Sequence, residues 1–178
     1  MQKILLHTCC APCSSSTISL LKEQFDIVSF WYNPNIYPLH EYELRKETWR
    51  EYMKLMKIET AEKNAAWLGS SELYEQLWLN EAVACKQGRC FFCYKKRLEE
   101  TAARAKELGI MNFSTTLLAS PYQKHEEIKD IARDTAEKNG LNFIYVDPRK
   151  EFYQGVNSVK KMGLYSQKYC GCKLSMRS

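Results

Sequence analysis

The chain has 178 residues, of which 45% are hydrophobic, and it carries a formal net charge of +5. This length suits one domain with a sizeable core, so we expect residues 1–178 to form a single domain. No apolar run approaches the length of a membrane span, and the start, MQKILLHT, has too few apolar residues for a signal-peptide core. We therefore expect a soluble, cytoplasmic protein with no membrane partner.

Five short runs rich in β-branched and aromatic residues predict strands, at residues 3–7, 27–32, 58–61, 112–117 and 142–146. Between them, apolar residues recur at the three- and four-residue spacing that is typical of helices. Alternating strands and helices predict an α/β fold with a parallel sheet of about five strands and helices on both faces.

Ligands of such sheets bind beyond the carboxyl ends of the strands. The first predicted strand runs directly into Cys9 and Cys10. The other strand ends carry turn-forming residues, which any α/β protein would have there. Because adjacent cysteines are not ordinary turn residues, we expect a metal site at the C-terminal strand ends.

Eight cysteines in a cytosolic chain indicate metal ligands or redox catalysts, because cytosolic thiols stay reduced. Pro12 suits the first turn of a helix, and residues 14–16 are serines that could satisfy its free amides. Cys9, Cys10 and Cys13 would then surround a helix N-terminus, where the helix dipole favours thiolates.

A second cysteine pair, Cys90 and Cys93, opens a later predicted helix. Two thiolate pairs from distant parts of a chain make a four-sulfur site, which either zinc or an iron–sulfur cluster could occupy. Both pairs flank the expected crevice rather than form a separate lobe, which favours a redox cluster. Cys85 is expected to pack at a helix end.

The third group, Cys170-Gly171-Cys172, has one residue between its cysteines. A disulfide across so short a loop is strained and exchanges readily, so a two-electron redox pair is one interpretation. The other interpretation is that both cysteines bind the same metal as the first two groups.

Residues 145–178 carry the whole net charge of the chain. Such a basic segment favours a polyanionic partner through counterion release, although a solvated basic surface explains it too. Its cations are Arg149, Lys150, Lys160, Lys161, Lys168, Lys173 and Arg177.

Six stretches together resemble one known family. They are HTCCAPCS, FWYNPNIYP, EYELRK, CFFCYKKRL, TTLLASPYQKHEEI and FYQGVNSVKKMGLYSQKYCGC. With these motifs the sequence resembles the epoxyqueuosine reductase QueH family, the non-cobalamin kind, over almost its entire length.

The resemblance implies a Rossmann-like fold and the last step of queuosine biosynthesis, the conversion of epoxyqueuosine to queuosine in tRNA. It implies one 4Fe-4S cluster on Cys9, Cys10, Cys90 and Cys93. It also implies two partners: tRNA carrying epoxyqueuosine in its anticodon loop, and an electron donor that the sequence does not identify. Spare thiolates near Cys13 and Cys172 would permit a second adjacent metal ion. The implied redox-active pair is Cys170 and Cys172.

Three other classes compete with this interpretation. A zinc-stabilised RNA-binding module without catalysis explains the thiols and the basic segment, but not the closely spaced pair near the C-terminus. A thiol–disulfide oxidoreductase explains that pair and would act without metal. An ATP-dependent tRNA-modifying enzyme of related fold needs a Gly-rich phosphate loop, and the sequence has no such motif.

Further residues are candidates for proton donation, base stacking or phosphate contact. His7 is expected to be a satisfied core histidine, and His125 to cap a helix start. The candidate proton donors are Tyr165, Tyr169 and Asp147. The candidate base-stacking residues are Tyr32, Tyr37, Tyr122 and Tyr153. The candidate phosphate contacts are Arg45, Arg149 and Lys168.

Overall fold

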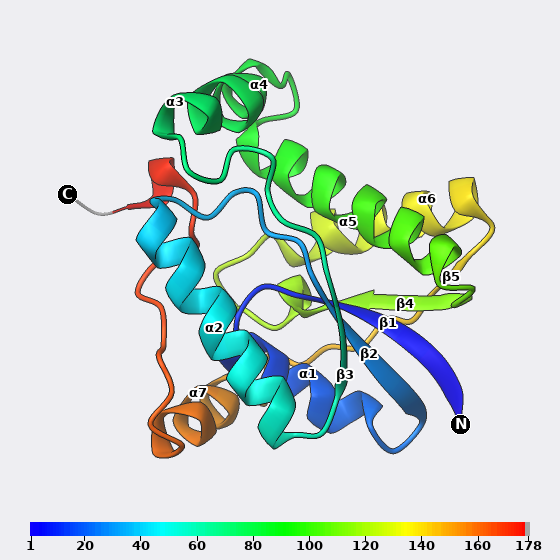
Figure 1. The fold of residues 1–178 in the computed structure, drawn as a ribbon. Coiled ribbons are helices and arrows are strands. Elements are labelled where there is room, and N and C mark those ends of the chain that lie inside the picture. Colours follow the sequence, from blue (N-terminus) through cyan, green and yellow to red (C-terminus); the bar gives the residue numbers. More distant parts are fainter. Residues whose placement is uncertain (177–178) are drawn as a thin grey trace.

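A computed structural model describes residues 1–176 of the chain. Its centre is a five-stranded sheet in the order β3-β2-β1-β4-β5, in which every neighbouring pair is parallel (Figure 1). This confirms the predicted α/β fold. The strands are β1 (Gln2–Thr8), β2 (Phe25–Trp31), β3 (Glu59–Glu62), β4 (Asn112–Thr115) and β5 (Asn142–Phe143).

Helices cover both faces of the sheet, as the sequence predicts. Helices α1, α2 and α7 pack on one face, and α5 and α6 pack on the other (Figure 1). The longer helices are α1 (Ala11–Leu21), α2 (Leu39–Leu55), α5 (Arg89–Glu107), α6 (His125–Asn139) and α7 (Phe152–Lys161). The short elements are α3 (Ser71–Tyr74), the π-helical turn η1 (Glu75–Leu79), α4 (Asn80–Ala84), and the 3₁₀ turns η2 (Thr116–Leu118) and η3 (Lys173–Ser175).

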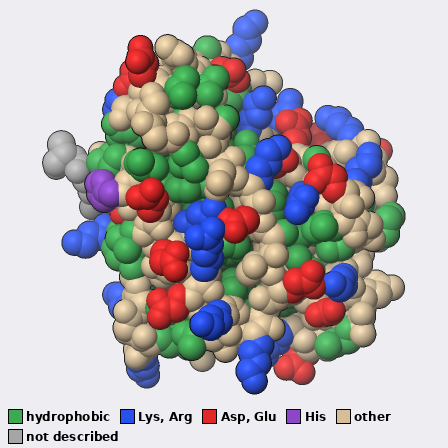
Figure 2. Space-filling model, in the orientation of Figure 1, with side chains coloured by type: hydrophobic (Ala, Val, Ile, Leu, Met, Phe, Trp, Pro, Cys, Tyr) green, Lys and Arg blue, Asp and Glu red, His purple; other side chains and the backbone are tan. Residues whose placement is uncertain are grey.

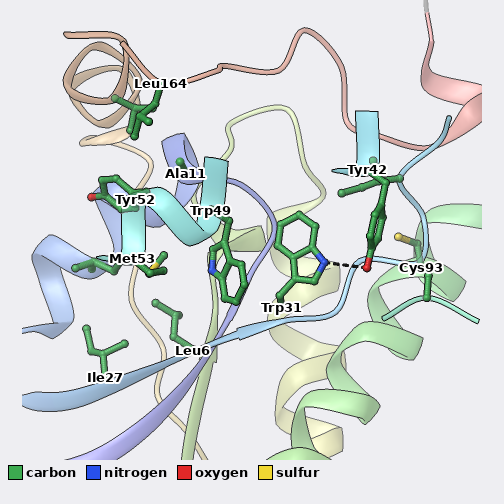
Figure 3. Close-up of a cluster of buried hydrophobic side chains, with 14 of the residues drawn as sticks. Leu6, Ala11, Ile27, Trp31, Tyr42, Trp49, Tyr52, Met53, Cys93 and Leu164 are labelled. Atoms are coloured by element: carbon green, nitrogen blue, oxygen red, sulfur yellow. Dashed lines mark hydrogen bonds between the residues drawn. The ribbon is translucent and has the colours of Figure 1, made fainter. Parts of the chain in front are cut away.

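Two hydrophobic clusters follow from the alternation of side chains along the strands. On β1, Ile4 and Leu6 face the cluster under α1, α2 and α7, while Leu5 faces the cluster under α5 and α6. Tryptophan and tyrosine side chains fill the first cluster, where the indole of Trp31 donates a hydrogen bond to the Tyr42 hydroxyl at 3.0 Å (Figure 3). Buried aromatic polar groups are thus paired, as a stable core requires.

Some local expectations differ from the structure. The fourth strand ends at Thr115 and passes into η2, and the fifth ends at Phe143. The serines at 14–16 do not satisfy amides: the Ser14 and Ser16 hydroxyls donate to the carbonyls of Cys10 and Cys13 inside α1. These hydroxyls turn back onto the helix because Cys10 already occupies the N-cap position.

Helix α7 lies close against α1 because one of its residues is a glycine. A Cβ atom on Gly155 would lie 3.0 Å from the Pro12 carbonyl oxygen and 3.1 Å from the Ser16 amide nitrogen. A larger residue would push the helices apart. This close approach fixes the start of α7, and with it Phe152, beside the N-terminus of α1.

Acidic and basic side chains are interspersed over the face drawn in Figure 2. No helix among the described residues is long and apolar enough to cross a membrane. Arg177, one of the cations of the basic segment, lies outside the described residues.

Candidate metal centre

The candidate site lies where the strand order reverses. Strands β1 and β4 are neighbours, and the chain leaves them toward opposite edges of the sheet. At this switch point the Cys9 amide donates to the Thr116 hydroxyl at 3.2 Å, which ties the ends of β1 and β4 together. The structure therefore places the first cysteine group at the C-terminal strand ends, as predicted.

Three thiols meet at this point. The sulfur atoms of Cys9, Cys10 and Cys13 all lie within 4.8 Å of one another, and among the described residues they form a group that could hold a metal ion. Cys10 is the N-cap of α1 and Pro12 sits in its first turn, so the sulfurs surround the positive end of the helix dipole. Cys10 and Cys13 are buried and Cys9 is half-buried.

Contacts within the group separate the acidities of the three thiols. Hydrogen bonding with Cys10 and Cys13 holds the pKa of Cys9 well below its usual range, and the charge of Arg97 adds to this effect. Burial raises the pKa of Cys10, and bonds to Cys10 and Cys9 raise the pKa of Cys13. Cys9 is thus the thiol that most readily becomes a thiolate, the form that binds metals.

A cavity of about 490 Å³ opens beside the thiols. This volume is in the range of small-ligand sites. The cavity is lined by Cys9, Cys10 and Cys13, by Cys170 from the C-terminal segment, and by polar and aromatic side chains that include Gln123 and Phe152. A molecule that bound in this cavity would therefore lie next to the thiols.

Cys90 and Cys93 lie in the first turns of α5, as predicted. Cys93 is buried at the edge of the first hydrophobic cluster (Figure 3), and burial raises its pKa to about 12. Cys90 is half-buried against the second cluster. Neither belongs to the group of sulfurs within 4.8 Å, so the four-cysteine ligand set stays a prediction.

A buried arginine lies between the two cysteine groups. The side chain of Arg97 donates to Cys93 Sγ at 3.6 Å and to Asn33 Oδ1 at 2.6 Å, while its Nε has no partner. Burial alone would lower the pKa of Arg97, but electrostatic interaction with neighbouring cysteines, Cys93 and Cys9 foremost, raises it.

Within residues 1–176, no carboxylate pairs with Arg97. A buried guanidinium is costly without an anion. The surroundings of Arg97 therefore fit an anionic thiolate–metal group.

The Cys170-Gly171-Cys172 segment is held against the start of α2. Arg45 donates to the carbonyl oxygens of Tyr169 and Cys170 at 2.9 and 3.2 Å. Gly171 has a φ of +118°, and a Cβ there would lie 3.2 Å from Arg45 Nη1, so only glycine suits this position.

Both cysteines of this segment are free thiols. Cys170 is exposed and lines the cavity, whereas Cys172 is half-buried and burial raises its pKa.

The candidate proton donors are engaged elsewhere. The Tyr165 hydroxyl donates to Glu41, and burial together with this bond raises its pKa to about 12. The Tyr169 hydroxyl donates to the Tyr37 carbonyl. Asp147 binds Arg149, which lowers the pKa of the carboxyl to about 2. None of these three offers a free proton to the cavity in this structure.

The structure also shows the surroundings of the two histidines that the sequence singled out. His7 is buried, with its two ring nitrogens 3.0 Å from the Thr115 hydroxyl and 3.1 Å from the Tyr32 carbonyl, which confirms a satisfied core histidine. The capping role of His125 is wrong, because Lys124 is the N-cap of α6 and the His125 ring contacts Tyr145.

Among the predicted phosphate contacts, only Lys168 lines the cavity as a cation with a free end. The Arg45 side chain is buried with Glu41, and Arg149 is paired with Asp147.

Sequence reasoning missed two residues at the site. Gln167 donates from Nε2 to Cys10 Sγ at 2.8 Å, and Arg97 contacts Cys93. The spacing of Cys93 and Arg97 places them one helical turn apart, which was a usable signal. Nothing in the sequence links Gln167 to a cysteine 157 residues away.

Fold and site together define a parallel α/β protein with a thiol-rich centre at the switch point of its sheet, suited to a metal. The chain belongs to the epoxyqueuosine reductase QueH family, whose model matches residues 4–178.

Two relatives illustrate this membership. The epoxyqueuosine reductase QueH of Dehalococcoides mccartyi is 36% identical, over 97% of this chain and 92% of its own length. That of Thermotoga maritima is 35% identical, over 99% of this chain and 91% of its own length.

A solved structure supports the fold alone. A deacetylase of teicoplanin biosynthesis superposes with a TM-score of 0.53, covering 90% of this chain and 85% of that chain at 9% identity.

Proposed function

We propose that this protein reduces epoxyqueuosine to queuosine in tRNA. The observation that carries the proposal is the family match over residues 4–178. The reaction replaces an epoxide by an alkene, so it consumes two electrons and two protons and releases the oxygen as water. The protein must therefore collect two electrons beside a bound nucleoside, in the cytoplasm where tRNA is modified.

The proposed ligands of a 4Fe-4S cluster are Cys9, Cys10, Cys90 and Cys93. Three features support an anionic metal group here: the readily ionised Cys9, the helix N-terminus and the buried Arg97. Such a cluster would supply one-electron transfer beside the cavity. Cys13, within the same group of sulfurs, would leave a ligand for a second adjacent metal ion.

Cys170 and Cys172 are the proposed dithiol. Oxidation of two thiols to a disulfide releases two electrons and two protons, which matches the demand of the reaction. The exposure of Cys170 to the cavity supports this role, and so does the raised pKa of Cys172, which keeps a proton on that sulfur. An external donor of electrons must then reduce the disulfide in each cycle.

The last part of the proposal concerns the domain and its basic segment. We propose that residues 1–178 form one domain whose basic, redox-active segment, about residues 145–178, docks the substrate tRNA. Cys170 and Lys168 both line the cavity, which supports a shared role for this segment in chemistry and binding.

The test is conversion of epoxyqueuosine in purified tRNA, without oxygen and with a chemical reductant, measured as queuosine after nucleoside digestion. Wild-type protein should convert its substrate. Replacing Cys170 and Cys172 by Ser should abolish turnover while preserving the visible chromophore. Cys85→Ser should preserve both the turnover and the chromophore. Full activity in the double variant would remove the dithiol from the mechanism. Disulfide exchange that survives metal removal would favour a thiol–disulfide oxidoreductase.

A further inference from the structure

Tyr122, which lines the cavity, and its neighbour Tyr153 are unusually exposed. The side chains of Tyr122 and Tyr153 are 78% and 60% exposed, the highest values for aromatic residues in the described part of the chain. Large aromatic side chains are normally buried over most of their surface, so an exposed pair indicates an interaction site.

The two rings are held together although 31 residues separate them. Their hydroxyl oxygens lie 3.0 Å apart, in hydrogen-bond contact. The ring of Phe152 meets both edge to face, with centroid distances of 6.4 Å to Tyr122 and 5.2 Å to Tyr153. The Tyr122 amide also donates to the Ser120 hydroxyl at 3.3 Å. The pair is therefore ordered before any ligand arrives.

This aromatic group is continuous with the thiol centre. Phe152 packs against the cluster formed by Cys10, Cys13 and Ala119, and both Phe152 and Tyr122 line the cavity. Aromatic rings thus extend from the thiols to the exposed surface, and Tyr122 lines the cavity that the thiols share.

The other tyrosines that the sequence offered for stacking are not available. Tyr32 is half-buried, stacked on Phe30 with Lys63 over its ring. Tyr37 packs against Trp67 and Tyr74. The structure thus narrows four candidate stacking residues to two, and these two lie together.

We propose that Tyr122 and Tyr153 form a platform on which a nucleobase of single-stranded RNA stacks, next to the nucleotide that enters the cavity. This inference rests on the proposed function and names how its substrate is gripped. The cavity volume suits one nucleoside, so the neighbouring base stays at the rim, where the rings are. Bases of RNA loops are recognised by stacking on aromatic side chains. Lys168 in the cavity wall offers a cation for the intervening phosphate.

The experiment measures the Kd of a fluorescent RNA hairpin with the anticodon stem-loop sequence at several salt concentrations. Replacing both tyrosines by Leu should weaken binding about 10-fold or more. The salt slope should not change, because stacking neutralises no phosphate. Replacing both by Phe should keep the affinity within about two-fold, because the rings remain. Met111→Ala, 55% exposed at the opposite end of β4, is the control and should bind like wild type.

A second arm leaves the protein unchanged. Removing the base at each position that flanks the modified nucleotide should weaken binding to wild type at one of them by a similar factor. In the Leu double variant, removing the base at that position should cause no further loss of RNA affinity.

Several outcomes separate this inference from the proposed function. Unchanged RNA affinity in the Leu double variant, with conversion of epoxyqueuosine intact, would overturn the platform and leave the proposed function standing. Unchanged affinity with slower turnover from a protein electron donor would also overturn it, by assigning the surface to that donor. Wild-type protein that neither binds the hairpin nor converts the substrate would overturn both.

Discussion

Arg45 donates from Nη1 to the carbonyl oxygen of Cys170 at 3.2 Å, although 125 residues separate the two in sequence. The same guanidinium binds Glu41 Oε1 at 2.6 Å and lies 4.9 Å from the centre of the Tyr169 ring. Only 3% and 7% of the Arg45 and Glu41 side chains are exposed. This buried ion pair in the first turns of α2 therefore fixes the backbone of the proposed redox pair relative to the cavity.

Replacing Arg45 by Gln should release that segment. The variant leaves Glu41 buried without a cation, which costs about 3–5 kcal/mol in the free energy of unfolding. The measurement is the rate at which a thiol reagent modifies Cys170 and Cys172, expected to rise, together with denaturant unfolding. Arg50→Gln on the same helix is the control, because its pairs with Glu62 and Glu47 are exposed and worth little.

Changing Glu41 and Arg45 together to Gln separates charge from positioning. The double variant removes both buried charges, so it should recover stability while the thiols still react faster than in wild type. Thiol reactivity equal to wild type in both variants would show that Arg45 does not position the segment.

Arg97 should control metal retention. Arg97→Leu removes the cation that faces Cys9 and Cys93, so thiolates there lose their electrostatic stabilisation. We expect a several-fold loss of bound iron after reconstitution, measured per chain, while Arg97→Lys keeps part of it. Arg104→Leu on the same helix should bind metal like wild type, because its partner Glu107 is exposed and distant from the thiols. Full iron content in Arg97→Leu would contradict this role.

Single Cys→Ser substitutions should define the ligand set. Loss of Cys9, Cys10, Cys90 or Cys93 should reduce bound iron and sulfide to a small fraction of wild type, because each would remove a cluster ligand. Cys85→Ser is the matched control, since Cys85 follows the end of α4 and its sulfur donates a hydrogen bond to Gln87. A Cys90→Ser protein with full iron would move the site to the three thiols at the start of α1.

The basic segment should contribute to tRNA binding through phosphate contacts. Lys160 and Lys161 lie exposed in the last turn of α7. Replacing both by Gln should weaken tRNA binding and reduce the slope of log K against log salt by about one for each lost contact. A salt slope equal to that of wild type would place the tRNA elsewhere on the surface.

Much of the fold could be predicted from the sequence, because period and turn chemistry are local. The alternation of strands and helices gave the sheet, and the cysteines after β1 marked its functional edge. The end of β5 could not be predicted in this way. Residues 143–146 of the predicted run are all aromatic or aliphatic, but only Asn142 and Phe143 pair with β4.

The candidate site was harder to predict, because its contacts join distant parts of the chain. Cys13 was left outside the expected ligand set, yet helix geometry brings its sulfur to Cys9 and Cys10. Arg45 was expected to contact phosphate. Its burial against Glu41 and the C-terminal segment emerges only from tertiary packing.

The most direct test of the account is the metal content of protein purified without oxygen. The account predicts a brown protein with a broad visible absorbance that bleaches on reduction, and about four irons and four acid-labile sulfides per chain. A colourless protein that carries one zinc, even after iron–sulfur reconstitution, would contradict it. Those thiols would then be better explained as a zinc site that stabilises an RNA-binding module.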